Sequence, residues 1–96
     1  MIEFLEVAQE EMRAATSRYI STANSAGVKF LDAIRAALSK LKNDPESFPE
    51  FDEGFRCVRV SKFPYIIIFK IESDGTILVI AFSHTSRCPD YWRGRT

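Results

Sequence analysis

The sequence predicts an α+β fold in which a helical half precedes a β-sheet. In the first half of the chain apolar residues recur at steps of three and four, the period of an amphipathic helix. After Phe55 they fall into β-rich runs separated by turn residues such as Asp74-Gly75. With 96 residues and 46% hydrophobic composition, the chain fits one domain with a single core over residues 1–96.

The first half of the chain predicts a short strand over residues 2–6, followed by a helical hairpin. The first helix is expected over about residues 7–23. Its apolar stripe consists of Ala8, Met12, Ala15 and Tyr19. Residues 24–27 predict a turn. The stripe of the second helix consists of Phe30, Ile34, Leu38 and Leu41. That helix should end before Asn43-Asp44-Pro45, because proline cannot continue it, and so short a link should make the two helices antiparallel.

The second half of the chain predicts a loop and three strands. Residues 43–54 contain two prolines, a glycine and several acidic residues, which is typical of a loop. The strands are expected over residues 55–61, 65–71 and 77–83. Short connections should make them a three-stranded antiparallel meander, with the helices packed on one face.

Both faces of this sheet are expected to be apolar. In the second strand Ile66 and Ile68 alternate with Tyr65, Ile67, Phe69 and Ile71. In the third strand Leu78, Ile80 and Phe82 alternate with Ile77, Val79 and Ala81. A helical hairpin covers only one face of a sheet. We therefore hypothesise that a protein partner covers the other face; the chain's own tail and a second copy are the alternatives.

The net charge of +0 conceals an asymmetry between the two halves. Residues 1–54 carry six basic and ten acidic residues, whereas residues 55–96 carry seven basic and three acidic residues. The basic half favours a phosphate-bearing or acidic partner. The neutral total argues against strong binding of nucleic acid irrespective of its sequence, because such binding depends on excess basic charge.

The sequence gives no sign of a membrane, metal or nucleotide site. The N-terminus has neither a basic start nor a long apolar run, so we expect a cytoplasmic protein without membrane contact. Cys57 and Cys88 are too far apart for a CxxC pair, and His84 is the only histidine. We therefore expect free thiols, no metal and no cofactor. The chain also lacks a glycine-rich loop that could hold phosphates.

The last thirteen residues concentrate arginines and aromatic residues beyond the apolar third strand. Arginine forks bind carboxylates and phosphates at two points, and Tyr and Trp supply rigid contact area. Trp92 has a second interpretation, as a plug against the edge of the sheet. The predicted target-binding residues are Arg87, Tyr91, Trp92, Arg93 and Arg95.

Two motifs add to the order of the elements. One is the strand start Phe63-Pro64-Tyr65-Ile66-Ile67, and the other is the ending Ala81-Phe82-Ser83-His84-x-x-Arg87-x-Pro89-x-Tyr91-Trp92-x-x-Arg95. Together they resemble the RelE/ParE family of toxins from type II toxin–antitoxin modules, the family of plasmid stabilisation proteins. The likeness covers nearly the whole chain. It implies a small α+β toxin held inactive, in a hetero-oligomer, by an antitoxin whose extended or helical tail covers its groove and sheet.

The resemblance implies one of two targets. ParE-like members inhibit DNA gyrase, whereas RelE-like members cut messenger RNA within the ribosome without a metal. A nuclease needs a base, an acid and cations for the phosphate. The residues that could supply them are Arg59, Arg87, Tyr91 and His84. Cys57 and Ser61 stand where a nuclease-type member would carry further basic residues, so we favour growth arrest by gyrase inhibition over an enzymatic role. A non-toxic homologue that only binds antitoxin is a third alternative.

For the antitoxin contact the sequence leaves both sheet faces open. One face would offer Tyr65, Ile67, Phe69, Ile77 and Val79. The alternate face would offer Ile66, Ile68, Leu78 and Ile80.

Overall fold

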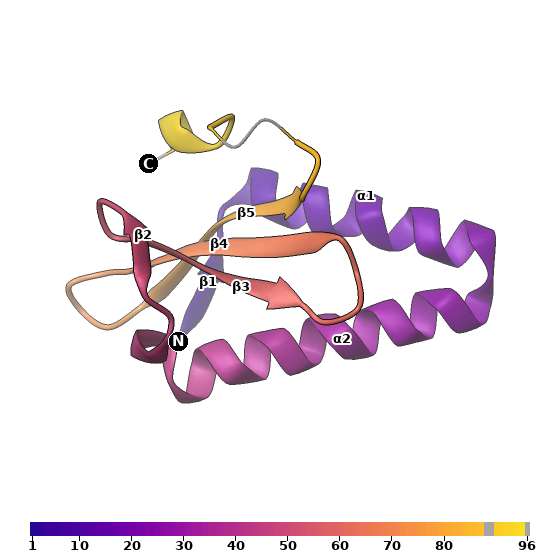
Figure 1. Ribbon diagram of the computed structural model, residues 1–96, viewed down its shortest axis with the longest axis horizontal. Helices are drawn as coiled ribbons and strands as arrows, with labels where there is room; N and C mark the ends of the chain where they lie inside the picture. Colours follow the sequence, from indigo (N-terminus) through magenta and orange to yellow (C-terminus); the bar gives the residue numbers. More distant parts are fainter. Residues whose placement is uncertain (88–89, 96) are drawn as a thin grey trace.

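The computed structural model describes residues 1–87 and 90–95 and has the α+β architecture that the sequence predicts (Figure 1). The predictions for Cys88, and for Pro89 of the C-terminal motif, lie outside the described residues. No helix in the described part of the chain is long and apolar enough to cross a membrane. The elements are β1 (Ile2–Phe4), α1 (Glu6–Thr22), α2 (Asn24–Asn43), η1 (Pro45–Ser47), β2 (Glu50–Asp52), β3 (Phe55–Val60), β4 (Tyr65–Ile71), β5 (Ile77–His84) and η2 (Arg93–Arg95).

The helical hairpin is tighter than the sequence suggests. The predicted turn over residues 24–27 is wrong, because these residues form the first turn of α2 and Ala23 alone separates the two helices. Ala23 is extended, with φ −167°, which reverses the chain in one step. Gly27 serves close packing rather than a turn: a Cβ at this position would lie 2.5 Å from Cγ1 of Ile20 on α1. The glycine therefore lets the two helices approach each other where they meet.

The segment after α2 is more ordered than the predicted loop over residues 43–54. It contains η1 and the short strand β2, which pairs antiparallel with β3. Glu53 and Gly54 make the reversal with φ of 29° and 86°, a conformation that suits glycine. The loop prediction is wrong for residues 50–52. Two prolines just before them suggest a loop, and so short a strand forms only because it pairs with β3.

The sheet has five strands in the order β1-β5-β4-β3-β2: the predicted N-terminal strand and three-stranded meander, together with β2, which was not predicted. β1 pairs parallel with β5, and the other neighbours are antiparallel. The register of β4 and β5 shifts by one residue, so that Ile68 lies opposite Ala81 and Phe69 opposite Val79. This bulge at Ile80 reverses the predicted faces of Ala81 and Phe82, because an extra residue moves every later side chain to the other face.

The main core lies between the helical hairpin and one face of the sheet. Phe82 belongs to it after the bulge and packs against Phe30 of α2 and Tyr65 of β4, with ring centroids 6.0 and 5.1 Å away. One of the two proposed antitoxin faces forms this core, because each of the following side chains is at most 4% exposed: Tyr65, Ile67, Phe69, Ile77 and Val79. That face is therefore closed to an antitoxin in this conformation.

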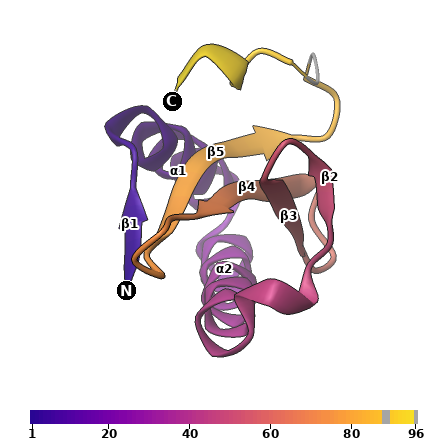
Figure 2. The ribbon, with the colours of Figure 1, turned by 90° about the vertical axis from the view of Figure 1, so that its left-hand side faces the viewer.

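The second face of the sheet is covered in part by the chain's own C-terminal segment, residues 90–95 (Figure 2). Trp92 is 2% exposed and packs edge-on against Phe55, with ring centroids 4.6 Å apart. Trp92 is part of a second core cluster on this face, which consists of Phe55, Ile68, Ile80, Ala81 and Trp92. The hypothesis that another molecule must cover this face is thus wrong for Ile68 and Ile80. Ile66 and Leu78 remain half-buried.

Candidate functional site

Arg95 anchors the C-terminal segment to the body of the protein. Its Nη1 and Nη2 donate to the two carboxylate oxygens of Glu11 on α1, at 2.8 and 3.0 Å, and Nη1 also donates to the carbonyl oxygen of Ile80 at 3.1 Å. The backbone N–H of Phe82 donates to the same carboxylate at 3.1 Å. Burial opposes ionisation of Glu11, but the hydrogen bonds from Arg95 and Phe82 prevail and lower its pKa. This two-point ion pair joins α1, β5 and the chain's end.

Arg93 fastens the other side of the same segment. Its guanidinium forms ion pairs with Asp52 of β2 and with Asp90, and lies 4.9 Å from the Trp92 ring. The hydrogen bonds that Arg93 donates to the carboxylates of Asp90 and Asp52 raise its pKa. Three predicted target-binding residues therefore hold the segment on the sheet: Trp92 and Arg95 lie largely buried, and Arg93 pairs with acidic groups at the surface.

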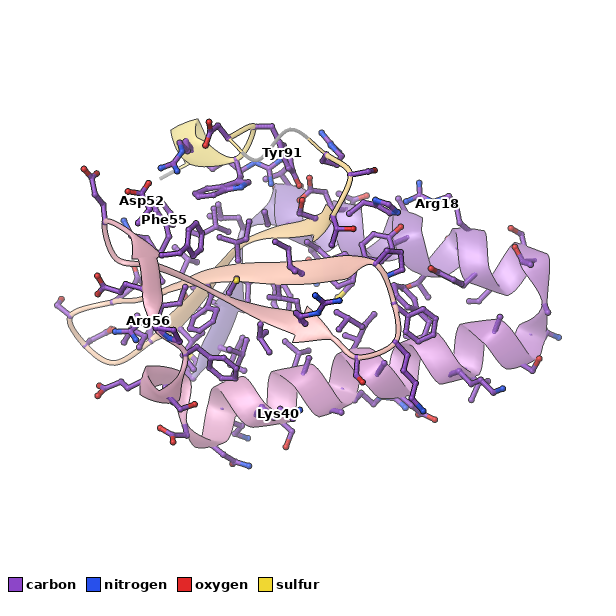
Figure 3. The ribbon with its side chains drawn as sticks, viewed as in Figure 1. Arg18, Lys40, Asp52, Phe55, Arg56 and Tyr91 are labelled. Atoms are coloured by element: carbon purple, nitrogen blue, oxygen red, sulfur yellow. The ribbon has the colours of Figure 1, made fainter. Side chains whose placement is uncertain are left out.

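Tyr91 belongs to the same segment, and its ring packs on the second face of the sheet (Figure 3). Its ring centroid is 4.0 Å from the guanidinium carbon of Arg87 and 4.9 Å from that of Arg95. Its hydroxyl is buried, near the side chains of Ser83 and Glu11. Burial, followed by the nearby Glu11 carboxylate, raises the pKa of Tyr91. The phenol is therefore poorly placed to exchange a proton with a bound substrate.

Arg87 differs from the other two arginines of the tail. Its side chain is 52% exposed, and its contact with Glu11, at 4.0 Å, is only a long ion pair. Beside it an apolar pocket of about 200 Å³ opens on the second face of the sheet. Arg87 and His84 form its polar rim, and its apolar wall consists of Phe51, Cys57, Ile66, Ile68 and Trp92. A cation beside an apolar hollow suits a protein partner that offers an acidic group next to an apolar one.

The four candidate catalytic residues do not converge. His84 and Arg87 line the same pocket, but Arg59 lines a different hollow, along β3, with Lys40. Arg59 pairs with Ile66, and Ile66 with Ser83, so Arg59 sits two strands from β5. Strand spacing puts about 10 Å between their backbones. The structure thus brings His84, Arg87 and the Tyr91 ring close together, leaves Arg59 apart, and buries the Tyr91 hydroxyl.

Comparison with known proteins decides the family. The family described as "ParE toxin of type II toxin-antitoxin system, parDE" matches residues 2–89. The chain belongs to the ParE toxin family. A solved structure titled "Chromosomal ParDE TA system from P. aeruginosa" shares the fold, with a TM-score of 0.72 over 86% of this chain and 92% of that one. The two are 14% identical in sequence, so the likeness concerns the fold alone. No curated protein matches the chain.

The site of this ParE-family chain contains two residues that sequence reasoning missed. Glu11 and Arg18 come from α1, yet Glu11 contacts Arg95 and Arg18 donates to the Tyr65 hydroxyl at 2.9 Å. Glu11 and Arg95 are 84 positions apart, so no local pattern could connect them. Within residues 1–87 and 90–95 no group of three or more His, Cys, Asp or Glu could hold a metal ion.

A further apolar groove, of about 420 Å³, lies between the two helices. Leu31, Ile34 and Leu38 line it from α2, and Arg13 and Arg35 provide its charged groups. Met12 and Leu38 of the predicted apolar stripes line this groove and remain partly exposed.

Proposed function

We propose that this ParE-family chain arrests growth by inhibiting DNA gyrase, and that the surface around Arg87 makes the contact. The observation that carries the proposal is that the tail arginines differ in their exposure and in their ion pairs. Arg95 is largely buried against Glu11, and Arg93 forms short ion pairs with two carboxylates. Arg87 is 52% exposed, approaches Glu11 only to 4.0 Å, and lies beside an apolar pocket. An exposed arginine next to an apolar hollow is a typical energetic centre of a protein–protein contact.

The same geometry argues against the nuclease alternative. Metal-free cleavage of RNA needs a base, an acid and cations around one phosphate. Here Arg59 lies two strands away, and the hydroxyl of Tyr91 is buried beneath the tail. The neutral net charge also gives little general attraction for the ribosome.

The gyrase proposal is tested with purified protein in a supercoiling assay. We expect the wild-type chain to inhibit supercoiling and Arg87→Ala to lower its potency by about tenfold, because a charged contact contributes on the order of 1.5–3 kcal/mol. Arg35→Ala, at an arginine on α2 that is exposed away from this surface, is the control and should inhibit as well as wild type. Unaffected supercoiling, together with discrete cuts in messenger RNA after induction, would show that the nuclease alternative is correct.

We infer that a cognate antitoxin neutralises the chain by covering the open part of the second sheet face. Of the four residues proposed for this face, Ile68 and Ile80 are buried beneath Trp92, so Ile66 and Leu78 are the ones that a partner can reach. Ile66 also lines the pocket beside Arg87. An antitoxin seated there would hide the effector surface.

The antitoxin contact is tested with the product of an adjacent reading frame. Ile66→Asp should weaken binding at least tenfold, because it places a carboxylate in an apolar contact. Leu31→Asp, in the groove between the helices, is the matched change at the other accessible apolar surface. Calorimetric titration of both variants separates the two surfaces: a loss confined to Leu31→Asp would place the antitoxin on the helices and contradict this proposal.

A further inference from the structure

A small hollow at the end of β5 collects hydrogen-bond donors from three elements. It has a volume of about 120 Å³ and lies between α1 and the sheet. Arg18 enters it from α1, Tyr65 from the start of β4, His84 from the end of β5, and Arg87 from the segment that follows. Arg18, Tyr65 and the pair of His84 and Arg87 come from three distant parts of the sequence. The pairing of Tyr65 with His84 in β4 and β5 brings the last two parts together.

The hydrogen bonds around His84 fix where its proton lies. The backbone N–H of Ser86 donates to Nδ1 at 3.0 Å, and a backbone N–H can only donate. Nδ1 is therefore the acceptor, and the neutral ring carries its proton on Nε2. Similarly, Arg18 donates to the Tyr65 hydroxyl oxygen at 2.9 Å, which leaves the phenol proton free to donate elsewhere. Both rings thus retain a donor.

The charge in the hollow is positive despite the presence of Glu11. Both carboxylate oxygens of Glu11 are held by Arg95, which balances the negative charge from outside the hollow. Arg87 approaches this carboxylate only to 4.0 Å. Arg18 and Arg87 are the remaining charged groups among the side chains that line the hollow, and both are cationic.

We propose that this hollow binds a single oxyanion, the phosphate or carboxylate group of a ligand, through Arg18, His84 and Arg87. Two arginine forks and an imidazole N–H are the donors that such groups accept in proteins, and the Tyr65 hydroxyl supplies a fourth. The volume is below the roughly 300 Å³ of pockets that hold drug-sized ligands, so a lone anionic group fits and a nucleotide does not. The proposal is independent of the target of the toxin.

The test is a titration of the isotope-labelled protein with sodium phosphate and, in a second arm, with sodium acetate. Sodium chloride keeps the ionic strength constant, and the side-chain resonances of His84 and Arg18 are followed by NMR. We expect saturable shifts in at least one arm. Tighter binding of phosphate would identify a phosphate group as the ligand, and tighter binding of acetate would identify a carboxylate.

Variants separate this site from general ion association. Arg18→Gln and Arg87→Gln should each weaken binding by about tenfold, because each removes a charged donor. Arg35→Gln, at an exposed arginine elsewhere, should leave the affinity unchanged. Amide spectra of all three variants verify that the fold is kept. Shifts that never saturate in either arm, or that are equal in Arg18→Gln, Arg87→Gln and wild type, would overturn the proposal.

Discussion

Glu11 is the residue on which the C-terminal segment depends. Its carboxylate accepts two hydrogen bonds from Arg95 and one from the backbone of Phe82, while its side chain is only 13% exposed. A buried carboxylate with this many donors stabilises the fold only while it is ionised. The contact makes Glu11 a structural residue, although its neighbour Glu10 on the same helix is exposed.

Replacing Glu11 with Gln should therefore destabilise the protein. We expect the free energy of unfolding to fall by about 2 kcal/mol at neutral pH, because a charged pair is lost and Arg95 keeps only weaker partners. Denaturant titration measures the effect. Glu10→Gln is the control on the same helix and should change stability by less than about 0.5 kcal/mol. Equal losses in the two variants would contradict the anchoring role of Glu11.

The same pair predicts how stability depends on pH. The pKa of Glu11 is lowered in the folded state from its ordinary value of 4.5. Its contribution is therefore fully present above that value and is lost as the pH falls through the lower pKa of the folded state. The difference between wild type and Glu11→Gln should accordingly shrink below pH 4.5 in a series of unfolding titrations.

At the scale of elements, the C-terminal segment behaves as a separate layer on the second sheet face. Trp92 is its largest buried group and packs against Phe55 and Phe51, with ring centroids 4.6 and 5.8 Å away. Without this ring the apolar residues of β4 and β5 beneath it would meet water. The segment thus covers part of the second face, as the helical hairpin covers the first.

Trp92→Ala should destabilise the protein and expose the second sheet face. We expect a loss of about 3 kcal/mol in unfolding free energy, because a large ring is removed from a packed site. We also expect increased binding of an apolar dye to the exposed second face. Phe51→Ala is the control, since Phe51 contacts the same ring but is 49% exposed. A Trp92→Ala variant as stable as the control would mean that the segment is not part of the fold.

The sequence predicts the elements better than the contacts between them. Periodicity and turn residues place both helices and the three main strands within a few residues of their observed ends. They fail at β2, whose pairing depends on β3, and at Ile80, where the bulge breaks an alternation that the sequence alone shows as regular. The sequence shows the tail as a cluster of arginines and aromatic residues, but two of its acidic partners, Glu11 and Asp52, are distant in sequence.

Considered as a whole, the molecule has one sheet face covered by helices, a second face covered in part by the C-terminal segment, and one open sheet edge. Figure 2 shows the helices on one side of the sheet and the C-terminal segment on the other. β2 pairs only with Phe55 and Arg56. Residues 57–60 of β3 therefore pair with β4 on one side and have no strand on the other side among the described residues. An open edge of this kind invites pairing with another chain, and charged side chains are a common protection.

Arg59 is placed to provide that protection. It is exposed in the middle of the open stretch of β3, and Lys40 and Lys62 line the same hollow. Because the whole chain has a net charge of +0, general repulsion between molecules is weak and local charge matters more. The positive charge at this edge therefore opposes the approach of the same edge of a second copy.

Arg59→Val should convert this edge into a site of self-association. Valine favours strands and removes the charge, so we expect light scattering and the apparent mass to rise with protein concentration. The free energy of unfolding of the dilute protein should change by less than about 0.5 kcal/mol, because the position is exposed. Arg59→Lys retains the charge and should remain as dispersed as wild type. If Arg59→Val showed the same mass as Arg59→Lys at every concentration, the edge would be blocked by its geometry and not by its charge.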